Sequence, residues 1–107
     1  MADLMSVPSP TQRALELEEV GCDIVCVHTA TDARQSGEDA FENVKLLRSQ
    51  LSKAQIAVAG GIDVRSAAAA CESGADILVV GSGIVKAGEP REAARTLHNI
   101  CAAWARR

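Results

Sequence analysis

The sequence of 107 residues has no long apolar run, no excess of basic residues and no C-x-x-C pair of cysteines. A membrane-spanning helix needs roughly 20 mostly apolar residues, and a secretory signal needs a basic segment followed by an apolar one. Neither pattern is present. The net charge of −3 gives no positive field for a polynucleotide. We therefore expect no membrane partner, no nucleic-acid partner and, by default, a cytoplasmic location.

The cysteines also lack the spacing of a metal site or a redox motif. Cys22, Cys26, Cys71 and Cys101 form no C-x-x-C motif and do not cluster with histidine. Such cysteines usually serve as small apolar side chains, and they fit a reducing compartment best. The sequence therefore predicts no metal ligands in this chain.

Glycine and proline divide the chain into alternating strand-like and helix-like segments, a pattern typical of a parallel sheet with helices. The length predicts a single domain over 1–107. A complete eightfold (β/α) barrel needs roughly 200 residues, so we expect a (β/α) half-barrel, the TIM-type architecture with about four parallel strands. The predicted strands are 2–7, 23–27, 55–59 and 77–80, and the predicted helices follow at 10–20, 41–51, 64–73 and 90–104.

Several residues mark where the helices should begin and end. Ser9 and Gln12 have the spacing of a capping box around Pro10 at the first helical position. Asp63 is the expected N-cap of a later helix. Gly21 and Gly74 are placed to end helices in the left-handed conformation, which glycine adopts at little cost.

Two consecutive strands, both expected to be buried, run into glycine-rich turns. Strand 55–59 is followed by Gly60-Gly61-Ile62, and strand 77–80 by Gly81-Ser82-Gly83. Glycine lets the backbone approach an anion closely and point successive N–H groups at it, and a helix that begins after the turn adds a partial positive charge. The pair of turns favours a phosphate site. The alternative is that both are simply tight connections between strand and helix.

An internal repeat places a histidine opposite the second glycine turn. Residues 19–27 align with 72–80, with identical Glu, Gly, Asp, Ile and final Val positions, which indicates one structural unit used twice. Asp23 and Asp76 then recur at strand starts, where we expect them to contribute to stability. His28 falls at the carboxyl end of its strand, in register with Gly81.

His28 and Asp3 are the candidate catalytic residues. Histidine titrates near neutral pH and suits proton transfer, and active sites of barrels lie at the carboxyl ends of the strands. Asp3 lies within a predicted strand, where an unpaired buried carboxylate is costly, so a functional position at the barrel mouth is favoured. A structural role for His28 at the strand end remains the alternative.

Four segments, in order and spacing, resemble the C-terminal half of the 3-hexulose-6-phosphate synthases, which belong to the orotidine 5'-phosphate decarboxylase superfamily. These segments are residues 2–8, 27–32, 58–62 and 79–84. The Gly-Gly-Ile and Gly-x-x-Ile motifs occur in many phosphate-binding barrels, whereas His-Thr-x-x-Asp is more specific. The resemblance covers essentially the whole chain and implies that its strands correspond to strands five to eight of the family barrel.

By this resemblance, we expect condensation of ribulose 5-phosphate with formaldehyde through a magnesium-stabilised enediolate, and the reverse lyase reaction. His28 would transfer protons near the carbonyl, Asp3 would face the opposite half-barrel, and Thr29 and Asp32 would shape the substrate loop. The residues that would hold the phosphate are Gly60, Gly61, Ile62, Gly81 and Ser82.

The sequence departs from the family at four places, the first of which is Ala30, where synthases often have glycine. The related 3-keto-L-gulonate-6-phosphate decarboxylases have arginine three residues after the histidine, where this chain has Thr31, which favours the aldolase branch. Decarboxylase relatives often have arginine at the position of Ser82. The family's Asp-x-Lys-x-x-Asp motif, with the catalytic lysine and a metal-binding aspartate, is absent.

Three interpretations of the chain follow. It is a synthase half whose second half supplies the lysine and the magnesium ligands, an inactive phosphate-binding or structural half-barrel, or a decarboxylase-like enzyme. The expected partners are a sugar phosphate of the ribulose 5-phosphate class and either a second copy of the chain or a complementary half-barrel.

Overall fold

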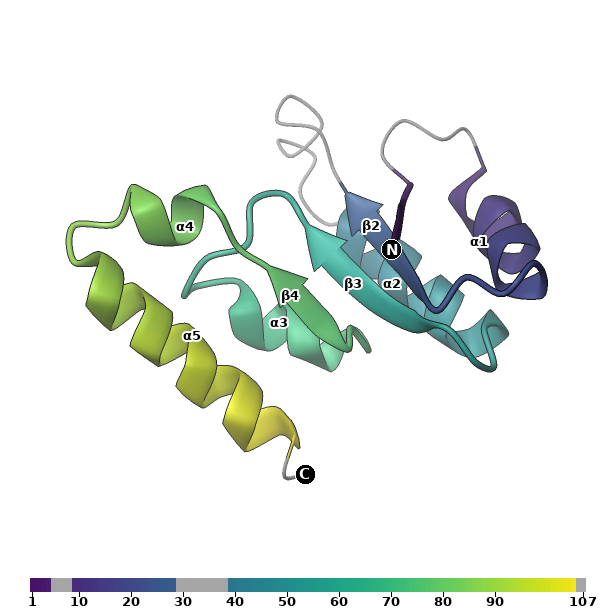
Figure 1. The fold of residues 1–107 in the computed structure, drawn as a ribbon. Helices are drawn as coiled ribbons and strands as arrows, with labels where there is room; N and C mark the ends of the chain where they lie inside the picture. The colour runs from purple at the N-terminus through teal and green to yellow at the C-terminus, as the bar shows by residue number, and fades with distance from the viewer. Residues whose placement is uncertain (5–8, 29–38, 106–107) are drawn as a thin grey trace.

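A computed structural model describes residues 1–4, 9–28 and 39–105, and shows one parallel sheet with the strand order β1-β2-β3-β4 (Figure 1). The strands are β1 (Ala2–Asp3), β2 (Ile24–His28), β3 (Gln55–Ala59) and β4 (Ile77–Val79). The predicted half-barrel of four parallel strands alternating with helices is confirmed. The strand β1 is shorter than the predicted strand 2–7: it ends at Asp3, Leu4 still donates its N–H to the carbonyl oxygen of Cys26 at 2.8 Å, and residues 5–7 lie outside the described residues.

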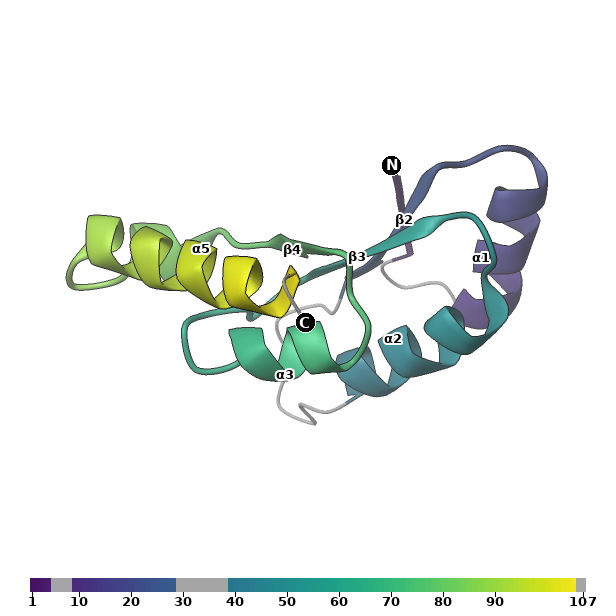
Figure 2. The ribbon, with the colours of Figure 1, turned by 90° about the horizontal axis from the view of Figure 1, so that it is seen from below.

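Within the described residues, helices cover one face of this sheet and not the other. The helices are α1 (Pro10–Glu19), α2 (Asp39–Gln50), α3 (Ala67–Glu72), the one-turn α4 (Ser82–Val85) and α5 (Pro90–Ala105). Figure 2 shows α1, α2 and α3 on the same side of the sheet, while α5 packs against α3 beyond β4. In the described part of the chain, no helix is long and apolar enough to cross a membrane.

The main core lies between the sheet and the helices. Successive strand residues point to opposite faces, and alternate residues of β2 and β3 pack against α2. The fully or nearly fully buried members of this layer are Val25, Val27, Val44, Leu47, Ile56 and Val58. The other face carries a smaller cluster of Cys26, Ala57 and Ala59, with Ile24 and Ile77 packed at its margin.

The strand β4 is less buried than we predicted. Ile77 and Leu78 are only half-buried, and Val79 is 40% exposed. The reason is its position: β4 pairs with β3 on one side and ends the sheet on the other, and no described helix covers its second face. Of the two strands that we expected to be buried, only β3 is, from Ile56 to Ala59.

The helix ends agree with the sequence in part. Gly21 and Gly74 have φ values of 96° and 109°, so both end helices in the left-handed conformation as predicted. The capping box is wrong, because the Ser9 side chain makes no capping hydrogen bond. The helix expected from residue 64 begins at Ala67. Its upstream Asp63 carboxylate instead accepts the N–H groups of Arg65 and Ser66 in a turn.

Asp76 fixes the end of the sheet opposite His28. Its Oδ2 accepts the backbone N–H of Ile56 at 2.9 Å and the Arg48 guanidinium at 2.8 Å. One carboxylate thus joins the start of β4 to β3 and α2, which supports the stabilising role expected for this repeated aspartate.

Glu18 performs a similar function between α1 and the connection from α2 to β3. Glu18 is half-buried, whereas its neighbours Glu16 and Glu19 are exposed. Its Oε2 accepts the N–H groups of Lys53 and Ala54, both at 2.7 Å, and of Ser52 at 3.1 Å. These bonds lower the pKa of Glu18 because they favour the charged carboxylate, and the bond from Ala54 has the largest effect on the pKa.

We expect Glu18→Gln to lower the thermal unfolding midpoint, because an amide oxygen accepts hydrogen bonds from N–H groups less strongly than a carboxylate does. Since the folded-state pKa of Glu18 is lowered, its contribution is present above the pKa of the unfolded chain and is lost as the pH falls through the folded-state value. The difference between wild type and variant should therefore shrink in acid. Glu19→Gln is the matched control, and equal midpoints for the two variants at neutral pH would contradict the assignment.

Candidate functional site

The carboxyl ends of the strands bring the candidate residues to one edge of the sheet (Figure 1). His28 ends β2, Gly60 and Gly61 follow β3, and Gly81 and Ser82 follow β4. The register pairs His28 with Ala59, and Ala59 with Val79. Parallel pairing thus aligns three neighbouring strand ends, which is the arrangement that barrels use for their active sites.

The structure joins the two candidate catalytic residues in one pair. His28 Nδ1 lies 2.8 Å from Asp3 Oδ2, across the β1–β2 pairing in which Asp3 is the register partner of Cys26. His28 and Asp3 are 32% and 51% exposed. The sequence indicated both residues but did not pair them, because the link depends on the register between strands 25 residues apart.

The pairing determines which nitrogen of His28 is available for chemistry. An ionised carboxylate only accepts hydrogen bonds, so Nδ1 is the protonated nitrogen in this contact. Nε2 is then left to accept a proton from a bound molecule or to return one. Asp3 holds the ring in a fixed orientation, as a carboxylate does for the histidine of a catalytic triad.

The first glycine turn has the backbone conformation expected of an anion-binding turn. Gly60 and Gly61 have φ values of 93° and 76°, a region that other residues adopt only with strain. Ile62, which follows them, is buried in the main core and anchors the turn. Two successive residues with positive φ therefore expose a backbone with no side chain at this strand end.

The second turn uses its glycines differently. A Cβ atom on Gly81 would have open space around it. At Gly83, a Cβ would collide with the carbonyl oxygen of Ile62 and lie 3.1 Å from the Cα of Asp63. The two turns are therefore packed directly against each other. We did not single out Gly83 from the sequence, although the Gly-x-Gly spacing carried the signal.

Together the turns form a continuous strip of backbone. The one-turn helix α4 begins at Ser82, and the first hydrogen bonds within it run from the N–H groups of Ile84 and Val85 to the carbonyl oxygen of Gly81. The N–H groups that precede them in the chain have no carbonyl partner within the helix. Ser82 is exposed and adds a hydroxyl group.

Asp63 places a negative charge beside this strip. Burial alone would raise the pKa of Asp63, but hydrogen bonds from the N–H groups of Arg65 and Ser66 outweigh it and lower the pKa. The Arg65 guanidinium lies 3.6 Å from the carboxylate. The charge is thus held within its own turn and partly balanced, which limits its repulsion of a bound anion.

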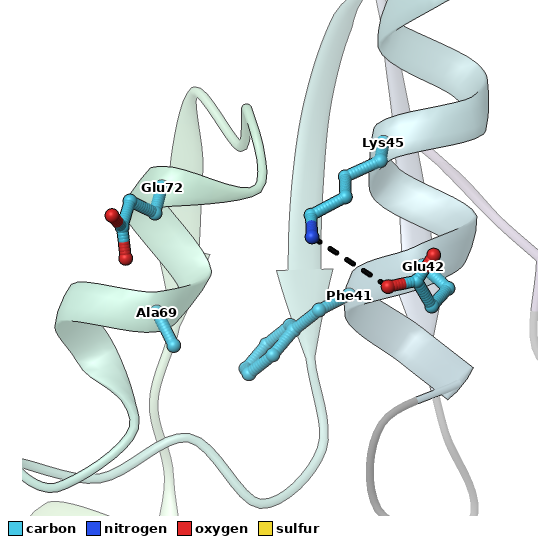
Figure 3. A pocket seen from close by; sticks show the side chains of 5 residues that line it. All are labelled: Phe41, Glu42, Lys45, Ala69 and Glu72. Carbon is cyan, nitrogen blue, oxygen red and sulfur yellow. Dashed lines mark ion pairs between the residues drawn. The ribbon is translucent and has the colours of Figure 1, made fainter.

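Other predicted features fall elsewhere. Thr29 and Asp32, the expected substrate-loop residues, lie outside the described residues. A hollow of about 420 Å³ between α2 and α3 is lined by Phe41, Glu42, Lys45, Ala69 and Glu72 (Figure 3). Lys45 and Glu42 are paired there at 3.5 Å. This hollow lies in the helix layer and includes none of the candidate site residues.

Comparison with known proteins identifies the fold family. The sequence profile of the orotidine 5'-phosphate decarboxylase / HUMPS family matches residues 1–97. The chain belongs to this family. The resemblance inferred from the sequence is therefore confirmed at the level of the family, and the sheet described above is part of the family's barrel.

Several of the similar proteins are named 3-hexulose-6-phosphate synthases. One from Staphylococcus saprophyticus is 32% identical over 94% of this chain and 47% of its own length, and one from Staphylococcus aureus is 34% identical over 89% of this chain and 45% of its own length. The crystal structure of the enzyme from Salmonella typhimurium superposes with a TM-score of 0.86 at 32% identity, over 95% of this chain and 48% of that one. The chain thus spans about half the length of the family members that it matches.

Proposed function

We propose that this chain is the phosphate-binding half of a sugar-phosphate lyase of the 3-hexulose-6-phosphate synthase type. The reaction would be the aldol condensation of ribulose 5-phosphate with formaldehyde. The observation that carries the proposal is the His28–Asp3 pair at the same strand edge as two contiguous glycine turns. The similarity to proteins of that name supports the choice of reaction.

The glycine turns would hold the phosphate of the sugar. Gly60, Gly61, Gly81 and Ser82 would offer backbone N–H groups, and Ser82 also its hydroxyl group. Because Ser82 replaces an arginine found in decarboxylase relatives, the site lacks the paired hydrogen bonds of a guanidinium at this position. The affinity for phosphate would therefore come mainly from backbone groups.

His28 would transfer a proton near the carbonyl group of the sugar. With Nδ1 bound to Asp3, Nε2 is the atom that would take the proton from the substrate and give it back. The exposure of both side chains leaves the pair open to a ligand at the strand edge. A second half-barrel over the pair would exclude water from it and strengthen its electrostatic effect.

The remaining catalytic groups would come from a second half. The three lysines of the sequence are Lys45, Lys53 and Lys86, none of them on a strand. Among the residues that the structure describes, no group of three acidic, histidine or cysteine side chains could hold a metal ion. The described residues therefore do not fit magnesium.

The second candidate function is an inactive half-barrel that only binds phosphate or only takes part in assembly. It is favoured by the same observation, that none of the three lysines of the chain lies on a strand. The decarboxylase-like alternative has less support, because Thr31 and Ser82 replace arginines typical of that branch.

The decisive experiment combines this chain with the N-terminal half of a 3-hexulose-6-phosphate synthase and follows consumption of formaldehyde with ribulose 5-phosphate and magnesium. We expect no turnover by either half alone and turnover by the mixture. No turnover by a mixture shown to contain a folded complex would favour the inactive half-barrel.

We predict that Gly81→Val weakens binding of ribulose 5-phosphate at least tenfold. The open space around the glycine lets the fold accept the side chain, but the branched side chain would block close approach of the phosphate. Gly88→Val is the matched control, because a Cβ there also meets open space. Binding is measured by calorimetry, with ribulose as the ligand without phosphate. Equal affinity of the wild-type chain for the two sugars would show that the turns are not the phosphate site.

A further inference from the structure

The two cysteines of the C-terminal half of the chain are neighbours in the fold. Cys71 is in the last turn of α3 and Cys101 is on α5, these two helices pack against each other, and both cysteines line one hollow. The other two thiols have carbonyl partners: Cys22 donates to Ile24 at 3.1 Å and Cys26 to Val27 at 3.8 Å. All four are free thiols.

A hollow gives small molecules access to this thiol pair. The cavity of about 280 Å³ lies between α3, the start of β4 and α5, and both cysteines line it together with Gly74, Leu78 and Trp104. Cys71 is 4% exposed, whereas Cys101 is only half-buried. An oxidant that enters the hollow would therefore meet Cys101 first and find Cys71 behind it.

We propose that Cys71 and Cys101 form a reversible disulfide that fastens α5 to α3 when the chain meets a peroxide. The Cys101 thiolate attacks one peroxide oxygen, the O–O bond breaks, and the products are a sulfenic acid and hydroxide. The Cys71 sulfur then attacks the sulfenic sulfur and water leaves. In sum, two thiols and one hydrogen peroxide give one disulfide and two waters, and a dithiol reductant returns both electrons.

The surroundings assign the order of these two steps. Burial, followed by the neighbouring Cys101, raises the pKa of the Cys71 thiol, and a thiol kept protonated reacts slowly with peroxide. Cys101 is therefore the thiol that peroxide oxidises first, which leaves Cys71 as the partner that resolves its sulfenic acid. A disulfide needs the two sulfur atoms to come within about 2.05 Å of each other, and both cysteines lie on helices that pack together and face the same hollow.

The disulfide would connect the two helices that follow the glycine turns in the chain. The helix α3 follows the Gly60–Gly61 turn, and α5 follows the Gly81–Ser82 turn through α4. Closing a loop of about 30 residues between the cysteines restricts the unfolded chain. The oxidised protein is therefore expected to unfold about 10 °C or more above the reduced one at equal concentration.

The test treats the full chain with a small excess of hydrogen peroxide and counts the thiols that remain under denaturing conditions. Two of the four thiols should disappear, a peptide linking Cys71 to Cys101 should be found, and dithiothreitol should restore both thiols and the lower melting temperature. Cys22→Ser is the matched control and should form the same bond, whereas Cys101→Ser should not.

A second test uses only the wild-type chain, so it does not depend on the folding of a variant. Phenylarsine oxide joins two adjacent thiols with loss of one water, so the reduced wild-type chain should take up one equivalent and lose the same two thiols. Links between chains only, a link to Cys22 or Cys26, or an oxidised chain that melts no higher than the reduced one would overturn the proposal.

Discussion

The 107-residue chain alone is expected to form a dimer at micromolar concentration. One face of its sheet has no helix over it in the described structure (Figure 2). On that face Ile24 and Ile77 are half-buried and Val79 is 40% exposed, whereas Cys26, Ala57 and Ala59 between them are already buried. The sheet also has two edges, at β1 and β4. Uncovered apolar surface and unpaired strand edges both favour association.

A twofold arrangement would satisfy both edges at once. If β1 of each copy lies beside β4 of the other, eight strands close into one barrel, provided that tilt and stagger match. The bare face of each copy would then become part of a shared interior. The same surface would receive an N-terminal half of the family barrel, so that half should compete with self-association.

Sedimentation velocity on the wild type and two lysine variants tests this arrangement. Val79→Lys places a charge on the bare face at the β4 edge, and removing a charge from water upon association costs several kcal/mol, so the dimer dissociation constant should rise by roughly 10²-fold or more. Val20→Lys is the control, because Val20 is 82% exposed at the end of α1. A well-folded wild-type monomer at micromolar concentration would contradict the prediction.

The sequence predicted the parts of the structure that depend on local signals. The glycines at positions 21 and 74 ended helices because a positive φ is cheap only for glycine, and apolar runs marked the strands. Parallel strands have their carboxyl ends at the same edge, so His28 and the glycine turns could be placed together before the pairing of strands was known.

What could not be predicted depends on contacts between distant residues. Glu18 holds N–H groups 34 to 36 residues away, and the His28–Asp3 contact needs a particular register of β1 on β2. The capping box failed for the opposite reason, since a local motif was present but its side chain formed no bond. Burial of β4 was overestimated because apolar composition does not reveal which strand lies at an edge.

The largest catalytic effect is expected from His28 in a completed barrel. His28→Ala should slow the reaction of this chain with a synthase N-terminal half by roughly 10²–10⁴, the usual contribution of a positioned acid or base. Asp3→Asn should slow it in the same direction by a smaller factor, because the imidazole remains but loses the carboxylate that orients it. His98→Ala is the matched control, since His98 is exposed on α5 and does not belong to the strand ends that carry the candidate site.

Three readouts separate a chemical role of His28 from a structural one. The complex of each variant is first shown to form with the same affinity and to melt at the same temperature as the wild type. The fall should then appear in kcat rather than in KM, because the phosphate is held by the glycine turns and not by the imidazole. Added imidazole should restore part of the activity of His28→Ala, because it can carry the proton through the space left by the side chain. Undiminished turnover by a stable His28→Ala complex would show that the histidine is only a structural partner of Asp3. Turnover by the wild-type chain alone would show that its own residues perform the chemistry that we assign to the missing lysine.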